Sequence, residues 1–396
     1  MERTEVAYHE AVEVVRQCCG PVGLKASASA AGYHEVWARD SMITALGARY
    51  IPDPVIQDAL RASVSNLKMH QSSIGSIPNF INETGEQANF RAYADSGLWW
   101  LIGSANLAPD PQMSLKVLHW YEHQDVDRSG VISMQEASDW QDLLCTRGKG
   151  LSLNCLYVLA LRATAKLFHA SETEQGRRCL KLADKVAERV NRLFWYGGDG
   201  NMLPHIAHTF STMDNPLTDS LGRRRWIPTK HQLTGEQYYL PYLGFRTAGE
   251  WFDTLGNLLA VLAGVARDNE TRVILDFISR HRLDTHPVCC LTPAIQPGDA
   301  DWRDYYYPTN QPHHYHNGGI WPFIGGIYTA ALVKAGRLAD AAEALSKLAE
   351  TNLRGKFNEW HHGESGEPMG VEWQAWSAGC YLLAFECVRT QRVELV

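Results

Sequence analysis

The sequence predicts an all-α fold in which six antiparallel pairs of helices close into a ring. Three observations lead to this prediction. Apolar residues recur with the 3.6-residue period of amphipathic helices in about twelve segments. The joins between these segments alternate between long and short along the chain. No low-complexity linker interrupts the pattern, so a single domain is expected over residues 1–396.

The predicted helices follow one another from the first residues to the last. They cover residues 3–18, 39–49, 54–70, 95–106, 111–124, 150–169, 172–194, 249–266, 270–281, 319–335, 338–352 and 374–389. Short joins are marked by Pro-Asp-Pro at 52–54 and 109–111, where Asp suits the N-cap and the second Pro the first turn. Ser171 and Glu174 form a capping box, and Gly336 suits the position just after a helix.

The long joins are expected to meet at one mouth of the ring. They cover residues 19–38, 71–94, 125–149, 195–248, 282–318 and 353–373. Consecutive helices run up and down, so alternate joins emerge at the same end. An open solenoid of helical pairs is the alternative, but solenoid repeats are shorter and resemble one another, and no such repeat is present.

The composition narrows the class of protein. A net charge of −7 and a pI near 6.1 argue against nucleic acid as a partner, because phosphates need a basic surface. No run of eighteen apolar residues predicts a membrane helix, and the first residues lack the apolar core of a signal peptide. Nine cysteines, an odd number, are typical of reduced thiols, so we expect a cytoplasmic protein.

Tryptophans recur beside polar residues within or next to the long joins. These clusters lie at 37–40 (WARD), 95–100 (DSGLWW), 139–142 (DWQD), 316–322 (HNGGIWP), 358–363 (NEWHHG) and 372–376 (EWQAW). Large core residues with a satisfied polar tip would explain them equally well. Gathered at one mouth, however, flat apolar faces and carboxylates suit sugar rings. Hydrolysis of a sugar needs a proton for the leaving oxygen and a base that activates water.

Four segments resemble the neutral and alkaline invertases and, more broadly, the amylo-α-1,6-glucosidase domains of debranching enzymes. They are 95–100, 252–258 (FDTLGNL), 315–322 (YHNGGIWP) and 359–381 with its QAWSAG core at 374–379. This resemblance to six-hairpin glycosidases implies an (α/α)6 barrel and an inverting glycoside hydrolase without a cofactor. It implies a small α-glucoside as substrate, with sucrose first and an α-1,6-linked glucosyl group as the alternative. The run NEWHH at 358–362 departs from the Pro-Glu-Tyr-Tyr-Asp-like run of the invertases.

The resemblance implies that Asp95 is the general acid and Glu359 the general base. Glu364, Glu367 and Glu372 are neighbours that could replace Glu359. Desolvation beside tryptophan raises the pKa of a carboxyl group and a helix N-terminus lowers it, so Asp95 acts as an acid only where desolvation dominates. A purely structural N-cap is the alternative role for Asp95.

Further residues of the tryptophan-containing clusters are expected to bind substrate. They are Trp37, Arg39, Asp40, Trp99, Trp100, Asp139, Trp140, Asp142, His316, Asn317, Trp321, Gln374 and Trp376. Arg39 and Asp40 could hold hydroxyls, orient Asp95 or form a structural pair. Asp139 and Asp142 suit bidentate bonds to vicinal hydroxyls, although a solvated helix start explains them too.

No metal is expected at the catalytic centre. Residues 125–136 fit a twelve-residue calcium loop, with Asp125, Asp127, Ser129 and Glu136 as candidate ligands of a structural ion. The loop has no second copy, whereas EF-hands usually pair. A histidine metal site at His313, His314 and His316 lacks an acidic or cysteine partner at ligand spacing.

Two other classes of function remain open at this point. (α/α)6 barrels also host sugar epimerases, which would use a histidine pair drawn from His313, His314, His316, His361 and His362. A non-enzymatic sugar-binding protein would bind without turnover. All three interpretations share a small saccharide as partner, exclude nucleic acid and membrane, and leave homo-oligomerisation open.

Overall fold

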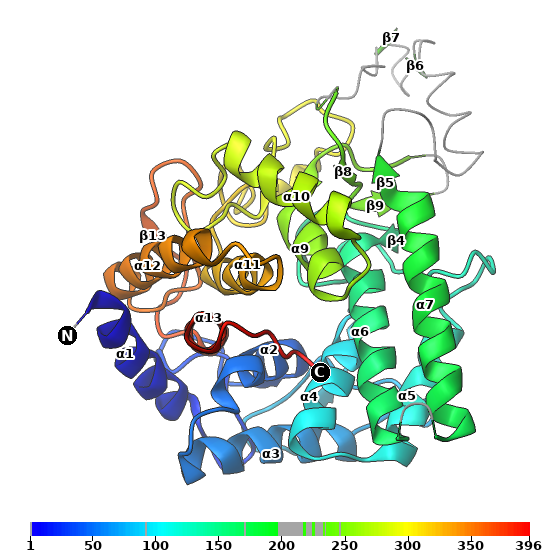
Figure 1. The fold of residues 1–396 in the computed structure, drawn as a ribbon, viewed down its shortest axis with the longest axis vertical. Helices are drawn as coiled ribbons and strands as arrows, with labels where there is room; N and C mark the ends of the chain where they lie inside the picture. Colours follow the sequence, from blue (N-terminus) through cyan, green and yellow to red (C-terminus); the bar gives the residue numbers. More distant parts are fainter. Residues whose placement is uncertain are drawn as a thin grey trace.

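The structure is a computed structural model of two concentric rings of helices (Figure 1). It describes residues 2–91, 93–169, 172–196, 217–218, 224–225, 233, 235–244 and 247–396. The inner helices are α2 (Ala38–Ala48), α4 (Ser96–Leu107), α6 (Leu151–Leu167), α9 (Thr254–Leu262), α11 (Pro322–Lys334) and α13 (Ala375–Thr390). The outer helices are α1 (Arg3–Cys18), α3 (Pro54–Met69), α5 (Pro111–Glu122), α7 (Glu174–Phe194), α10 (Asp268–Arg280) and α12 (Leu338–Gly355).

The inner helices form a closed circle. Each contacts the next in chain order, and α13 packs against α2 to complete the ring. Helix α11 is buried from Pro322 to Val333, and α4 from Ser96 to Ser104. Helices that are apolar all round must be covered on every face, and the outer, amphipathic helices cover them. The predicted all-α (α/α)6 barrel is confirmed.

Glycines let the two helices that close the ring approach each other. A Cβ atom at Gly47 of α2 would lie 2.1 Å from the carbonyl oxygen of Gly379 in α13. A Cβ atom at Gly379 would lie 2.4 Å from Cα of Thr44. Real Cβ atoms do not approach other atoms this closely, so the packing of α2 on α13 requires glycine at both positions.

Most predicted helix ends agree with the structure. Asp53 and Asp110 accept backbone N–H bonds at the starts of α3 and α5. Gly336 follows α11 with φ +73°. Thr173, not Ser171, caps α7 by accepting from Gly176 N, and Ser171 lies outside the described residues.

The helix predicted at 249–266 is shorter than expected. Residues Phe252–Asp253 form strand β10, which pairs antiparallel with β11 (Leu291–Thr292). The helix α9 then ends at Leu262, and Gly264 follows with φ +63°. Apolar periodicity could not reveal this two-residue strand, because its residues are buried like those of the helix.

Short strand pairs connect the long joins at the mouth. One sheet contains β1 (Val36–Trp37), β2 (Phe80–Ile81) and β3 (Ala88–Asn89), and β4 (Lys149–Gly150) pairs with β9 (Tyr242–Leu243). The remaining pairs are β12 (Trp360–His361) with β13 (Pro368–Met369), β5 (Trp195–Tyr196) with β8 (Tyr238–Tyr239), and β6 (Leu217–Thr218) with β7 (Arg224–Arg225). All pairs are antiparallel and join segments from different loops or from the two arms of one loop.

The last six residues cross the end of the barrel opposite the mouth. After α13 the chain runs into the middle of the ring, where Figure 1 marks the C-terminus. Leu395 is buried, and Asn106 of α4 donates to its carbonyl oxygen at 3.2 Å. Arg49 and Lys166 donate to the carbonyl oxygens of Glu394 and Val396. The C-terminal tail therefore links three inner helices.

None of the helices in the described ranges combines the length and the apolar content needed to cross a bilayer.

Candidate active site

The candidate site lies where the N-termini of the inner helices meet. Long joins lead from an outer helix into each inner helix, so all inner helices begin at the mouth. Arg39 and Asp40 lie in the first turn of α2, and Asp95 is the N-cap of α4. Asp253 and Gln374 are the N-caps of α9 and α13. The partial positive charges of the helix ends point into this region and favour the carboxylates placed there.

Arg39 connects two of the carboxyl groups. Its Nε lies 3.5 Å from Oδ2 of Asp40, and its Nη1 lies 3.7 Å from Oδ2 of Asp95. The guanidinium is surrounded by aromatic rings, with Cζ 5.8 Å from the ring centres of both Trp37 and Trp376. All three charged side chains are buried, so the pairs are screened little by solvent.

Asp95 is 1% exposed, and neither of its carboxyl oxygens has a hydrogen-bond partner among the described residues. Burial raises its pKa to about 6, although the positive charge of Arg39 acts in the opposite direction. The negative charge of Asp40 adds to the increase. The expectation that desolvation dominates at Asp95 agrees with this direction.

Glu359 lies in the loop that precedes β12 and is 6% exposed. Tyr315 donates its hydroxyl to Oε1 at 3.4 Å, and Val371 N donates to Oε2 at 3.5 Å. Burial raises the pKa of Glu359 to about 7, and the charges of Asp40 and Asp142 contribute. Asp40 therefore acts on both Asp95 and Glu359, which places the two candidate acids around one shared neighbour.

The segment 139–142 supplies a third buried carboxyl group. Asp139 accepts from Gln141 N at 2.9 Å through Oδ1, and Arg39 donates to its backbone carbonyl at 3.5 Å. Burial, followed by the charge of Asp95, raises the pKa of Asp139 to about 8. Asp142 accepts the hydroxyl hydrogen of Tyr93 at 2.8 Å. The fully buried Asp139 therefore holds its proton at neutral pH.

Aromatic rings form one wall of the site. Trp140 meets His316 edge-on at 5.1 Å and Trp321 at 5.5 Å between ring centres. His316 stacks on Trp321 at 5.1 Å, and Trp321 meets Trp376 at 5.7 Å. Burial lowers the pKa of His316 well below its ordinary value, so its imidazole is neutral at neutral pH. This wall offers flat apolar faces beside the carboxyl groups, as sugar binding needs.

Several buried polar atoms around these residues have no hydrogen-bond partner within the described chain. They are Trp37 Nε1, Asp40 Oδ2, Trp140 Nε1, Gln141 Nε2, Asp253 Oδ1, His316 Nδ1, Gln374 Nε2 and Trp376 Nε1. Buried donors and acceptors of this kind are costly unless they are satisfied. A mixture of donors and acceptors between aromatic rings suits a ligand with many hydroxyl groups.

Comparison with known proteins identifies the family relation. The family model described as alkaline and neutral invertase matches residues 223–390. The chain is 26% identical over 353 residues to probable alkaline/neutral invertase F of Arabidopsis thaliana, covering 82% of the chain and 70% of that protein. It is 26% identical to cytosolic invertase 1 of Oryza sativa, covering 80% of the chain and 60% of that relative.

The chain is related to the alkaline and neutral invertases. The predicted resemblance and the predicted glycoside hydrolase class are both confirmed. The chain spans 65% of the length of a second Arabidopsis thaliana invertase, probable alkaline/neutral invertase D.

Solved structures of other proteins have the same fold as this chain. A GH63 mannosylglycerate hydrolase from Thermus thermophilus superposes with a TM-score of 0.68 at 12% identity, covering 95% of the chain and 99% of that structure. A bacterial glucoamylase in complex with acarbose gives a TM-score of 0.63 at 14% identity, covering 98% and 56%. At these identities the likeness concerns the fold alone.

Two residues expected to bind substrate in the invertase-like site have other roles. Trp100 is fully buried on the outer face of α4, and its Nε1 donates to the carbonyl oxygen of Val64 in α3 at 3.1 Å. Asn317 donates to the carbonyl oxygens of Ile295 and Asn310 and accepts from Ile295 N. Its amide therefore holds the loop together. Trp99 is buried in the first turn of α4.

The predicted calcium loop is bonded to the protein itself. Asp125 accepts from Gly130 N at 3.0 Å and from Ser129 Oγ at 3.4 Å. Lys149 Nζ lies 2.8 Å from Asp127, and Arg303 forms an ion pair with Glu136 at 3.0 Å. Basic side chains thus neutralise Asp127 and Glu136, while Asp125 is bonded within its own loop. Among the described residues no group of three or more His, Cys, Asp or Glu side chains is placed to hold a metal ion, which does not favour the calcium hypothesis.

Burial lowers the pKa of three of the histidines that the epimerase hypothesis would use, His314, His316 and His361. Burial lowers the pKa of His361 to about 4, and its Nδ1 lies 3.1 Å from the carbonyl oxygen of Gly366. His314 and His362 meet edge-on at 4.7 Å, and desolvation lowers the pKa of His314. The buried imidazoles of His316 and His361 are neutral near pH 7, so neither fits the epimerase hypothesis, which needs histidines that exchange protons near pH 7.

Sequence reasoning missed four residues of the site. Tyr93 and Tyr315 bond to carboxyl groups of the site, and Tyr33 lies within electrostatic reach of them. Asp253 is the N-cap residue of α9, and its Oδ2 accepts from Ser152 Oγ of α6 at 2.9 Å. Burial raises the pKa of Asp253 to about 6. Asp253 and Tyr315 stand within segments that resemble the invertases, so that resemblance could have identified them.

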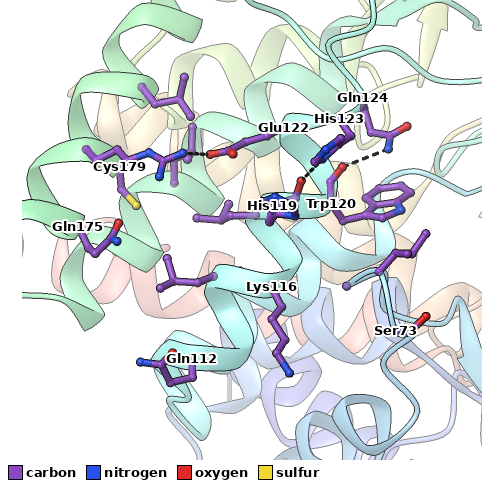
Figure 2. A pocket seen from close by; sticks show the side chains of 17 residues that line it. Ser73, Gln112, Lys116, His119, Trp120, Glu122, His123, Gln124, Gln175 and Cys179 are labelled. Atoms are coloured by element: carbon purple, nitrogen blue, oxygen red, sulfur yellow. Dashed lines mark hydrogen bonds and ion pairs between the residues drawn. The ribbon is translucent and has the colours of Figure 1, made fainter.

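A separate hollow of about 800 Å³ lies on the outside of the barrel between α5 and α7 (Figure 2). Two of its charged groups are paired with each other, since Arg178 bonds to Glu122 at 2.7 Å. His123 Nδ1 bonds to the carbonyl oxygen of His119 at 2.8 Å, and Gln124 donates to that of Trp120. Among the described residues that line it, Glu122 is the one carboxylate, so this hollow does not supply the pair of carboxyl groups that sugar hydrolysis needs.

Proposed function

We propose that this invertase relative hydrolyses sucrose with inversion at the anomeric carbon, using Asp95 as the acid and Glu359 as the base. One observation supports the proposal most. Two buried carboxyl groups, with pKa values raised to about 6 and about 7, both lie within electrostatic reach of Asp40 at a mouth lined by tryptophan. Carboxyl groups with these values hold or accept a proton near neutral pH, as a hydrolytic acid–base pair must.

In the proposed reaction Asp95 gives its proton to the glycosidic oxygen as the bond from the anomeric carbon to that oxygen breaks. Glu359 takes a proton from water, and the water oxygen forms the new bond from the opposite face. The products are fructose and glucose of inverted configuration. Two carboxyl groups in such an enzyme stand roughly 6.5–9.5 Å apart to admit the water.

The assignment of the two roles comes from the family resemblance and runs against the local charges. Arg39 lies 3.7 Å from Asp95 and favours its ionised form with a full positive charge, whereas Glu359 accepts from two neutral donors, a backbone N–H and a tyrosine hydroxyl, which favour its ionised form without such a charge. When Asp95 and Glu359 together carry one proton in the free protein, that proton is therefore mainly on Glu359. The direction agrees with the pKa values, which burial raises to about 6 for Asp95 and to about 7 for Glu359.

Kinetics with two substrates test the roles. α-D-Glucosyl fluoride has a leaving group that does not depend on the general acid. Asp95→Asn should reduce kcat/KM for sucrose by about 10³-fold and retain most activity on the fluoride. Glu359→Gln should reduce both by about that factor. If Glu359→Gln alone spares the fluoride, the two roles are exchanged. NMR of the first product should show β-glucose, and α-glucose would contradict inversion.

A second candidate substrate is an α-1,6-linked glucoside. The run at 358–362 departs from the invertase pattern, and Trp360 of this run lies 5.7 Å from the ring of Tyr315 next to Glu359. A changed surface beside the base favours a different leaving sugar. Hydrolysis of isomaltose with no release of fructose from sucrose would establish this alternative.

A cytosolic location is part of the proposal. The rice relative is named a cytosolic invertase, whereas other relatives carry mitochondrial or chloroplastic names. Fractionation of cells that express the full chain tests this location, and recovery in an organelle fraction would contradict it.

A further inference from the structure

Tyr33 lies in a loop that is fastened to the segment containing the proposed base. The loop joins α1 to β1, and its residues 26–28 pair with residues 373–375. Ala375 N donates to Ala26 O at 2.9 Å, and Ala28 N donates to Trp373 O at 3.1 Å. Because residues 373–375 lead from Glu359 into α13, this pairing fixes the position of the loop relative to the site.

The turn around Tyr33 is tightly closed. Ser27 N donates to the carbonyl oxygen of Tyr33 at 3.0 Å, and Gly32 N donates to Ser29 O at 2.9 Å. His34 Nε2 bonds to the same oxygen of Ser29 at 2.9 Å. A Cβ atom at Gly32 would lie 2.4 Å from Ser27 Oγ, so the turn needs glycine there. The backbone therefore holds Tyr33 in one place.

The phenol of Tyr33 lies within electrostatic reach of the carboxyl groups of the site. Burial raises the pKa of its hydroxyl to about 12, and the charges of Glu359, Asp142 and Asp40 contribute. These three carboxylates come from three different segments of the mouth, and the pairing of residues 26–28 with residues 373–375 holds the turn of Tyr33 on this side of the barrel. Tyr33 is nevertheless 43% exposed, whereas Glu359 is 6% exposed. Tyr33 thus belongs to the rim and Glu359 to the floor.

We propose that Tyr33 determines specificity by carrying the leaving-group sugar on its ring. The inference deepens the proposed function and rests on it. The buried floor holds the glycosyl unit that is attacked, so the departing sugar must extend toward the rim. A tyrosine offers an apolar face for a sugar ring and a polar tip for a hydroxyl. Tyr33 presents both at the rim, next to the proposed base.

The test compares a substrate that has a leaving sugar with one that lacks it. Sucrose and α-D-glucosyl fluoride share the glucosyl unit, but the fluoride has no second ring. Tyr33→Ala should lower kcat/KM for sucrose about tenfold, mostly through KM, since stacking of one ring is lost. The same variant should hydrolyse the fluoride within about twofold of the wild-type rate. Tyr33→Phe keeps the ring and should retain most activity on sucrose.

A matched control separates this effect from a general loss of fold. Tyr50, 39% exposed, lies after α2 at the opposite end of the barrel, so Tyr50→Ala should leave both substrates unchanged. Equal losses on both substrates in Tyr33→Ala, or no loss on either, would overturn the inference while sucrose hydrolysis by the wild type stands. If the wild type cleaves isomaltose instead, the same comparison is made with isomaltose. A wild type inactive on all three substrates refutes the proposed function, and this inference with it.

Discussion

At the scale of single residues, the site is dominated by carboxyl groups removed from water. Asp95, Asp139 and Glu359 are all buried, and their pKa values are raised to about 6, about 8 and about 7. Arg39 is the cation that lies next to Asp95 and Asp40. One guanidinium cannot compensate all of these acids, so protons must do so at neutral pH.

The first prediction concerns the pH dependence of hydrolysis. The active form of the Asp95–Glu359 pair carries one proton. Below about pH 6 both groups are protonated and no base is present, and above about pH 7 both are ionised and no acid is present. The profile of kcat/KM should therefore be a narrow bell with its maximum between pH 6 and 7. Initial rates across pH 4–10 measure it. A plateau that extends to pH 9 would contradict these raised values.

The second prediction concerns stability and Asp139. Its folded-state pKa of about 8 exceeds the unfolded value near 3.9. The folded chain therefore binds a proton that the unfolded chain has lost, and stability falls as the pH rises through this window. Asp139→Asn removes this fall in stability with rising pH, because the amide does not ionise. The variant should gain on the order of 2 kcal/mol over the wild type at pH 9 and little at pH 4. Urea unfolding at both pH values measures the difference, and an equal change at both would contradict the burial argument.

Much of the site could be predicted from residue types, because tryptophans and carboxylates recur in the long joins. The errors have physical causes. Helix α4 is buried all round, so periodicity could not show that Trp100 faces α3. Asn317 stands in a resembling segment, yet its amide bonds to Ile295 and Asn310, which lie nearby only in three dimensions. Tyr33 was missed because its turn reaches the site through pairing with residues 373–375.

At the scale of elements, the alternation of long and short joins was the decisive pattern. It predicted which ends of the helices share a mouth, and the inner helices indeed begin there. The predicted ends fall within a few residues of the observed ones for eleven of the predicted helices, the helix at 249–266 being the exception. Backbone hydrogen bonding at β10, which depends on a distant segment, was not visible in the sequence.

The third prediction tests the close approach of α2 and α13. Gly379→Ala would place a Cβ atom 2.4 Å from Cα of Thr44, so one of the two helices must shift. Overpacking of this kind costs about 1–3 kcal/mol. The thermal midpoint of the variant should fall by several degrees. Gly20→Ala is the control, since its Cβ atom would meet Gly23 O at an ordinary 3.5 Å. Equal stability of the two variants would contradict the role of Gly379.

At the scale of the whole molecule, the barrel has an open mouth and a closed end. Antiparallel strand pairs connect the loops at the mouth, whereas the short joins and the C-terminal tail cover the opposite end. The tail reaches α4 and α6 through Asn106 and Lys166. Its contacts cross the ring, so it links helices that are distant in the chain.

The fourth prediction follows from the tail. Deleting residues 391–396 removes the buried Leu395 and exposes the apolar surface beneath it. Burial of one leucine contributes about 1.5–3 kcal/mol, so the thermal midpoint should fall while KM for the substrate stays near the wild-type value. Calorimetry and initial rates provide the two measurements. A loss of substrate affinity without a loss of stability would contradict a purely structural role.

The position of the tail bears on how the protein should be handled in the laboratory. Val396 lies over α6 in the middle of the ring, whereas α1 begins at the outer edge (Figure 1). A purification tag or fluorescent fusion joined after Val396 would have to leave through this covered end and would pull Leu395 out of its buried position. Fusions at the N-terminus avoid that damage. Protein tagged at the C-terminus should unfold at a lower temperature because of the tag alone.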